Sequence, residues 1–253
     1  MGFKKNTSVY RYLLDIKNSR RAGFLVLIDP DRSSATEIVD QAKRCCEAGV
    51  DALLIGSSLM MKDGFSDYAQ AARDAVDIPI IIFPGETSHV STHADAILFL
   101  SLLSGRNPEY IIGEQVRSAP LIKKIGLEAI STAYLLIDSG HITSVEFMSN
   151  TKPIPSDKPE IAVAHAMAAE IFGMKLIYLE AGSGAATTVP DETIRAVVSG
   201  VDIPVMVGGG IREPAMAAAK VNAGASFVVV GNHLENTVNH ADFKAFVKAV
   251  QRY

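Results

Sequence analysis

Alternating apolar and amphipathic segments predict an α/β fold, a (β/α)8 TIM barrel in which eight parallel strands are ringed by helices. Eight short apolar runs recur along the 253 residues, and most are followed by a segment with helical spacing of its apolar residues. The runs are continuously apolar, as expected for parallel strands covered on both faces. Eight such units in about 250 residues match the size of this barrel. An open, doubly wound sheet is the alternative.

The expected strands are short apolar runs that end at glycine or polar residues. In chain order they are residues 24–28, 51–56, 78–85, 94–105, 127–137, 175–182, 203–210 and 225–231. The expected helices are residues 33–49, 66–76, 159–172, 191–199 and 213–223, and a last one that ends near residue 252. The first of them has a Ser/Thr start and stops at Gly49. Residues 102–124 are the least regular, so we expect the helical ring to be modified around its third helix.

Composition narrows the class of protein. Apolar residues make up 48% of the chain, which is enough for a sizeable core, and no linker divides residues 1–253, so we expect a single domain. A net charge of -4 argues against a nucleic-acid partner. No apolar run approaches the length of a membrane span. The only cysteines, Cys45 and Cys46, are neighbours without metal-ligand spacing, which favours a reducing, cytoplasmic location.

Glycines follow each of the last three predicted strands. They occur in Gly182-Ser183-Gly184, Gly208-Gly209-Gly210 and Gly231-Asn232. Glycines at a strand end that leads into a helix let backbone amides approach an anion. Loops after the last strands of such barrels often hold phosphate. Tight turns alone would explain one such site, but three together favour a phosphate cradle.

A carboxylate follows the first strand, in the stretch Leu27-Ile28-Asp29-Pro30-Asp31. The second strand ends in Ser57-Ser58. One carboxylate and one hydroxyl suit Mg²⁺, which takes further ligands from water and substrate phosphates. Asp29 as a turn or helix cap is an equally good interpretation. His89 and His93 have helical spacing but no acidic partner, and we interpret them as surface residues.

Nine motifs in sequence order resemble the geranylgeranylglyceryl phosphate synthase family. They are LIDPD, DALLIGSS, FPG, ADAILFLSLLSGRNPEYIIGEQ, TAYLLIDSG, NTKPIP, GMKLIYLEAGSGA, VGGGIR and VVVGN. YLEAGSGA with VGGGIR is the specific pair, since other phosphate-binding barrels share only the later glycines. The LIDPD form and the extended N-terminus are similar to the second group of this family, which also includes heptaprenylglyceryl phosphate synthases.

The resemblance implies a Mg²⁺-dependent prenyltransferase of ether phospholipid synthesis. Its substrates would be a prenyl diphosphate, by default geranylgeranyl diphosphate, and the 3-hydroxyl of sn-glycerol 1-phosphate. The implied metal ligands are Asp29 and Ser58, although Ser57 departs from the family's usual glycine and leaves open which serine reaches the metal. The implied glycerol phosphate site comprises Tyr178, Leu179, Glu180, Ala181, Gly182, Ser183, Gly184, Gly209, Gly210, Gly231 and Asn232. Arg212 and Lys152 are candidate cations.

Glu180 and Tyr178 are the expected catalytic residues. The Glu180 carboxylate is placed to take the proton of the acceptor hydroxyl, or only to orient it. Tyr178 and Tyr134 are placed to face a cationic carbon, with Tyr134 as a wall residue in the alternative. The expected prenyl groove includes Phe99, Leu102, Leu103 and Tyr134, together with Leu98, Tyr110, Ile111 and Ile112.

Three other functions compete with this prediction. They are prenyl transfer to an acceptor such as 3-phosphoglycerate, a phosphosugar isomerase or aldolase, and a non-catalytic phosphate-binding protein. The isomerase would need a catalytic lysine at a late strand end, and none is present. The lipid substrate implies transient contact with a membrane surface. The absence of tryptophan removes one strong interface anchor, and we expect a homodimer, with a hexamer as the alternative.

Overall fold

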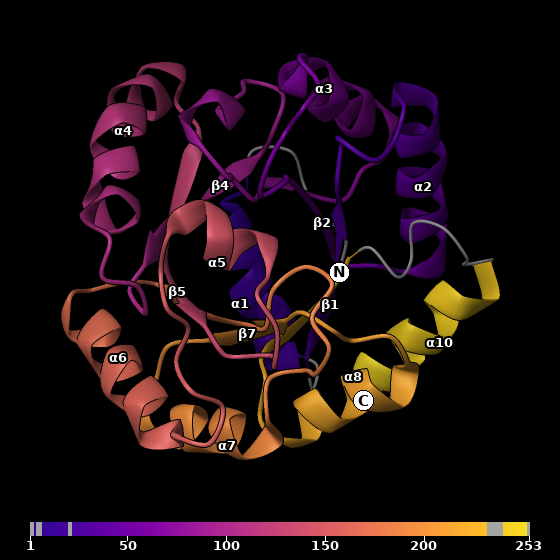
Figure 1. Cartoon of the computed structure of the whole chain (residues 1–253). Helices are drawn as coiled ribbons and strands as arrows, with labels where there is room; N and C mark the ends of the chain where they lie inside the picture. Colours follow the sequence, from indigo (N-terminus) through magenta and orange to yellow (C-terminus); the bar gives the residue numbers. More distant parts are fainter. Residues whose placement is uncertain (1–2, 4–6, 20–21, 232–239, 252–253) are drawn as a thin grey trace.

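Eight parallel strands close into a barrel in the computed structural model, as the sequence predicts (Figure 1). The structure describes residues 3, 7–19, 22–231 and 240–251. The strands are β1 (Gly23–Ile28), β2 (Ala52–Ile55), β3 (Ile80–Ile82), β4 (Ala96–Leu102), β5 (Glu128–Leu136), β6 (Leu176–Glu180), β7 (Val205–Gly208) and β8 (Phe227–Val230). Because β8 pairs with β1, the sheet has no open edge, and the alternative of an open sheet is excluded.

Helices surround the barrel (Figure 1). They are α1 (Val9–Ser19), α2 (Ala35–Ala48), α3 (Phe65–Ala75), α4 (Glu114–Ile125), α5 (Ser144–Ser149), α6 (Pro159–Ile171), α7 (Asp191–Gly200), α8 (Pro214–Asn222) and α10 (His240–Val250). Helix α2 begins and ends as its sequence predicts. The Ser34 and Glu37 side chains form a reciprocal capping box, and Gly49 ends the helix in the left-handed conformation.

The predicted modification of the helical ring is confirmed, but it begins earlier in the chain than expected. Between β3 and β4 there is only a single 3-10 turn, η1 (Thr87–His89), where an α-helix would complete the third unit. Within the irregular region itself, a π-helical turn, η2 (Glu109–Gly113), leads into a regular α4.

Two apolar clusters hold the barrel together. The outer cluster lies between the strands and the helices and includes Val26 and Ile28. The inner cluster fills the barrel and includes Leu25 on the opposite face of the same strand. Helix α1 contributes Val9 and Leu13 to the inner cluster and closes the N-terminal end of the barrel. There the Glu128 carboxylate at the start of β5 accepts hydrogen bonds from the first amides of α1, including Val9 N at 2.6 Å.

Strand alternation determines which side chains reach the open end of the barrel. Leu25 and Leu27 point inward on β1, so the next inward position, just past the strand, is Asp29. On β6 the same alternation turns Tyr178 and Glu180 inward. In the described part of the chain, no helix combines the length and apolar character needed to cross a membrane.

Candidate active site

A cavity of about 550 Å³ opens at the C-terminal ends of the strands. All eight strands or the loops that follow them contribute to its wall. The end formed by β6, β7 and β8 carries glycines and a carboxylate, and the end beside β4 and α4 is largely apolar. The cavity therefore suits a ligand with one phosphorylated part and one hydrocarbon part.

The Glu180 carboxylate is buried at the glycine-rich end, with 6% of the residue exposed. Its Oε1 atom accepts a hydrogen bond from Gly182 N at 2.7 Å. Burial raises the pKa of Glu180 to about 7, although hydrogen bonds from Gly182, Tyr178 and Ala181 act in the opposite direction. A carboxylate with a pKa near neutrality can accept a proton and release it at physiological pH.

The glycines next to Glu180 are required by the space that the carboxylate occupies. A β-carbon on Gly208 or Gly209 would overlap the Glu180 carboxylate. Gly182 and Gly184 also adopt φ angles of 97° and 75°, which favour glycine over other residues. The resulting loops present bare backbone to the cavity, which is the property of a phosphate cradle.

Three aromatic rings pack against one another in the cavity wall. The Tyr178 ring lies 5.4 Å from the Phe83 ring and 5.6 Å from the Tyr134 ring, measured between centroids. Burial, followed by the charge of Glu180, raises the pKa of both phenols, so both remain protonated. The buried Tyr178 hydroxyl lies beside the Glu180 carboxylate and interacts with it.

Asp29 follows β1, the neighbour of β8, and lines the same cavity as the glycines. Its Oδ1 atom accepts from Asp31 N at 3.0 Å, and its Oδ2 atom lies 3.3 Å from Arg32 Nε. Burial raises the pKa of Asp29, whereas hydrogen bonds from Asp31 and Ser57 and the charge of Arg32 lower it. The Ser57 hydroxyl donates to the Leu59 carbonyl oxygen at 2.9 Å and also interacts with Asp29, and Ser57 and Ser58 both line the cavity.

The donor set around Asp29 fits Mg²⁺ only when a ligand supplies further oxygens. Within the described ranges no three His, Cys, Asp or Glu side chains gather as a metal cluster. One carboxylate and two serine hydroxyls are hard oxygen ligands, too few to complete an octahedral shell. A diphosphate in the cavity would provide the missing oxygens.

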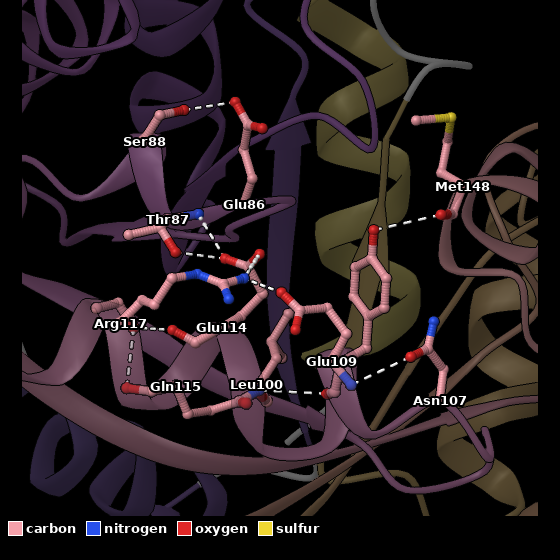
Figure 2. Close-up of polar contacts among 12 residues, drawn as sticks. Glu86, Thr87, Ser88, Leu100, Asn107, Glu109, Glu114, Gln115, Arg117 and Met148 are labelled. Atoms are coloured by element: carbon pink, nitrogen blue, oxygen red, sulfur yellow. Dashed lines mark hydrogen bonds and ion pairs between the residues drawn. The ribbon is translucent and has the colours of Figure 1, made fainter.

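The wall of the apolar end is held by a polar network between η1, η2 and α4 (Figure 2). Glu114 accepts hydrogen bonds from both the backbone amide and the hydroxyl of Thr87, the former at 2.9 Å. Arg117 bridges Glu114 and Glu109. The Gln115 amide donates to the carbonyl oxygens of Leu100 and Tyr110. These bonds fix α4 against β4 and η1, where the missing helix would otherwise lie.

The structure brings together most of the predicted site. Lining the cavity are Asp29, Ser57, Ser58, Leu98, Phe99, Leu102, Tyr110, Tyr134, Tyr178, Glu180, Gly182, Ser183, Gly184, Gly209, Gly210, Arg212 and Gly231. Leu179 and Ala181 instead point outward into the cluster between strands and helices. Leu103 packs against that same outer cluster, and Ile111, Ile112 and Lys152 also lie outside the cavity wall. Asn232 lies outside the described residues.

Sequence reasoning missed several lining residues and misplaced one histidine. Arg32 lines the cavity, and its spacing of three residues from Asp29 in DPDR was the available signal. Glu114 and Thr87 meet only through the fold. The expectation that His89 is a surface residue was wrong, because only 1% of it is exposed. Its ring stacks on Phe65 under the loop that follows β3.

Comparison with known proteins places this arrangement in a family. The model of the PcrB family matches residues 14–250, which is nearly the whole chain. The chain belongs to the PcrB family. PcrB-family relatives named geranylgeranylglyceryl phosphate synthase include one from Chitinophaga pinensis, 46% identical over 91% of each chain. Another, from Methanothermobacter marburgensis, is 45% identical over 91% of this chain and 93% of the relative.

A solved structure agrees with this PcrB-family assignment. The (S)-3-O-geranylgeranylglyceryl phosphate synthase of Thermoplasma acidophilum, solved with its substrate sn-glycerol-1-phosphate, superposes with a TM-score of 0.92. That protein is 34% identical, and the match covers 97% of this chain and 99% of that one. The predicted resemblance to geranylgeranylglyceryl phosphate synthases is therefore confirmed.

Proposed function

We propose that the chain is a Mg²⁺-dependent prenyltransferase. It joins the first carbon of a prenyl diphosphate, by default geranylgeranyl diphosphate, to the 3-hydroxyl of sn-glycerol 1-phosphate through an ether bond. The observation that carries the proposal is the placement of Glu180 beside a glycine cradle, in one cavity with Asp29 and an apolar groove. Relatives named for this activity support it.

The glycine-rich end would hold the acceptor. Backbone amides at Gly182 to Gly184 and at Gly209 and Gly210 can donate to a phosphate. Arg212, which also lines the cavity and donates to the Ala185 carbonyl oxygen at 3.0 Å, adds positive charge at this end. Glu180 and the Tyr178 hydroxyl beside it then lie where the glycerol hydroxyls would be held.

The opposite end would hold the donor. Asp29 and Ser58, with Ser57 directed at Asp29, are the residues that would bind Mg²⁺ between protein and diphosphate. When bound, the ion neutralises charge on the departing pyrophosphate. Arg32, whose Nε atom lies beside the Asp29 carboxylate, would add a second positive charge at this end. Phe99 and Leu102, both on β4, form part of the apolar wall that would receive the prenyl tail.

The reaction balances with the residues present. The bond between the allylic carbon and the diphosphate oxygen breaks, and its electron pair leaves with pyrophosphate. The acceptor oxygen forms the new bond to that carbon, and its proton passes to the Glu180 carboxylate. The faces of the Tyr134 and Tyr178 rings stabilise the developing positive charge. Holding both substrates in one cavity supplies much of the rate.

A transfer assay tests the proposal. Purified protein is incubated with labelled sn-glycerol 1-phosphate, Mg²⁺, and prenyl diphosphates of three lengths: farnesyl, geranylgeranyl and heptaprenyl. The expected result is an organic-extractable product that identifies the donor. sn-Glycerol 3-phosphate and 3-phosphoglycerate serve as competing acceptors, and a faster reaction with either would contradict the proposed acceptor. The absence of product with every pair would contradict the prenyltransferase function itself.

We also propose an oligomeric state and a cellular location for the chain. We expect a homodimer, which light scattering of the purified chain would measure. Both cysteines are free thiols, which supports a reducing compartment such as the cytoplasm.

A further inference from the structure

His89 is almost completely buried, and the proposed reaction gives it no role. It ends the single turn η1 that stands where the third helix is missing. Its ring stacks on Phe65, with centroids 4.5 Å apart and planes 7° from parallel. The ring is therefore fixed in position beneath the loop that follows β3.

The Nδ1 atom of His89 accepts a hydrogen bond from Gly85 N at 3.1 Å. Because Nδ1 accepts, it carries no proton, and the hydrogen of the neutral ring is on Nε2. Nε2 lies 3.9 Å from Glu86 Oε1. Burial lowers the pKa of His89, although the Glu86 charge acts in the opposite direction, and this favours the neutral ring. The imidazole thus works as a fixed acceptor for one backbone amide.

Gly85 is in close contact with the segment that carries the two serines. A β-carbon on Gly85 would overlap the Ser57 carbonyl oxygen and would lie 3.4 Å from the Ser58 α-carbon. A second contact of the same kind occurs one step earlier, where a β-carbon on Gly56 would overlap the Phe83 carbonyl oxygen. The ends of β2 and β3 are therefore packed backbone against backbone. A shift of Gly85 toward this segment would therefore require Ser57 and Ser58 to move.

We propose that His89 is a positioning residue, which fixes Gly85 and through it the Ser57-Ser58 segment opposite Asp29. This inference rests on the proposed function, because it assigns His89 to the diphosphate and Mg²⁺ end of the cavity. His89 itself does not line the cavity, so it acts only through the backbone. The glycine cradle around Glu180 belongs to β6 and β7 and does not depend on it.

Three substitutions of His89 test its hydrogen-bond acceptor and its aromatic ring separately. His89→Phe keeps an aromatic ring against Phe65 but removes the acceptor. His89→Asn loses the ring but places its amide oxygen at the position of Nδ1. His89→Gln carries its amide oxygen further out, at the position of Nε2. His93→Phe, a change to a half-buried histidine after the same turn, is the matched control.

The first measurement requires no substrate. Amide hydrogen exchange is followed in the free protein over residues 83–89, 56–59 and 180–184. With His89→Phe we expect exchange about tenfold faster in the first two segments, from the loss of one partly buried hydrogen bond, and unchanged exchange in the third. Equal acceleration in all three segments would indicate general destabilisation and would overturn the positioning role.

The second measurement compares the steady-state kinetics of the variants with those of the wild-type protein, once the transfer assay has shown the wild-type protein to be active. His89→Phe and His89→Gln should raise the Mg²⁺ concentration for half activity and the KM for the donor by about tenfold. The KM for sn-glycerol 1-phosphate should stay unchanged, and His89→Asn should restore wild-type values.

The outcomes separate this inference from the proposed function. Wild-type protein that is inactive with every substrate pair would contradict the function, and the exchange measurement would still decide whether His89 positions the loop. Active wild-type protein with His89→Phe indistinguishable from it would overturn the inference alone. If His89→Phe does not fold, the comparison of Asn with Gln decides, and equal behaviour of these two variants would overturn it.

Discussion

The Glu180 carboxylate occupies the space at the barrel mouth that a side chain at Gly209 would need, because a β-carbon at Gly209 would overlap the Glu180 Oε1 atom. The carboxylate comes from the end of β6, and the glycine follows β7. The carboxylate is therefore held by close backbone packing on one side and by its hydrogen bond from Gly182 on the other. This relationship is the basis of the first prediction.

Substitution of Gly209 should remove activity. Gly209→Ala adds a methyl group against Glu180 and imposes strain at a φ of 86°. We expect kcat/KM to fall by at least about a hundredfold, since small displacements of catalytic groups are costly. Gly173→Ala is the matched control, because Gly173 has a similar φ of 76° and open space around it. It should lower Tm by the backbone strain alone and leave kcat/KM unchanged; a similar loss of activity in both variants would contradict the prediction.

Replacement of the Glu180 carboxylate should distinguish proton transfer from orientation. Glu180→Gln keeps an oxygen that can accept from Gly182 N but cannot take a proton. We expect kcat to fall by about 10²- to 10⁴-fold, with little change in the KM for sn-glycerol 1-phosphate. Steady-state kinetics of the two proteins measure this. A loss of less than about tenfold would leave Glu180 an orienting group.

The pH dependence of the wild-type reaction should reflect the same carboxyl group. Glu180 has a pKa of about 7, so it is protonated below that pH and cannot accept the proton of the acceptor. We expect kcat/KM to fall about tenfold per pH unit below the pKa and to level off above it. Initial rates between pH 5.5 and 8.5, with buffers chosen to keep the enzyme folded, measure the profile. A flat profile would exclude Glu180 as the base.

Protein stability should respond to pH through Glu180 in the opposite sense to activity. The folded pKa of about 7 lies above the ordinary value of 4.5, so the folded state binds the proton more tightly. The stability gained from this tighter proton binding is complete below pH 4.5 and is lost as the pH rises to 7. At pH 8, Glu180→Gln should therefore be more stable than wild type by up to about 3 kcal/mol. Urea unfolding at pH 5 and pH 8 measures the difference, and equal differences at both would contradict it.

A larger side chain in the groove should shorten the donor that the enzyme accepts. Leu102 is buried on β4 and lines the apolar end of the cavity. Leu102→Trp should reduce the rate with heptaprenyl diphosphate more than the rate with farnesyl diphosphate, because added volume blocks the longer tail first. Leu103→Trp is the control, since Leu103 lies outside the cavity wall. An equal loss of rate with heptaprenyl and farnesyl diphosphate would show that the prenyl tail does not lie along β4.

The sequence alone predicted eight strand–helix units and the residue types at the ends of the strands, with an open sheet as the alternative to a closed barrel. Continuous apolar runs such as residues 176–179 are typical of strands covered on both faces. The glycines after β6 and β7 were recognisable because each ends an apolar run, where the backbone must turn. The period of two along β6 also places Tyr178 and Glu180 on one face.

Tertiary structure decided which of these residues meet, and which face of each strand is the inner one. Leu102 and Leu103 are equally apolar in the sequence, yet only Leu102 faces the cavity. The burial of His89 depends on Phe65 and on the absence of a third helix, neither of which a local spacing shows. The packing of Gly85 against Ser57 likewise exists only once β2 and β3 lie side by side. Local patterns fix the conformation of a segment, whereas contacts between distant segments are fixed by closure of the barrel.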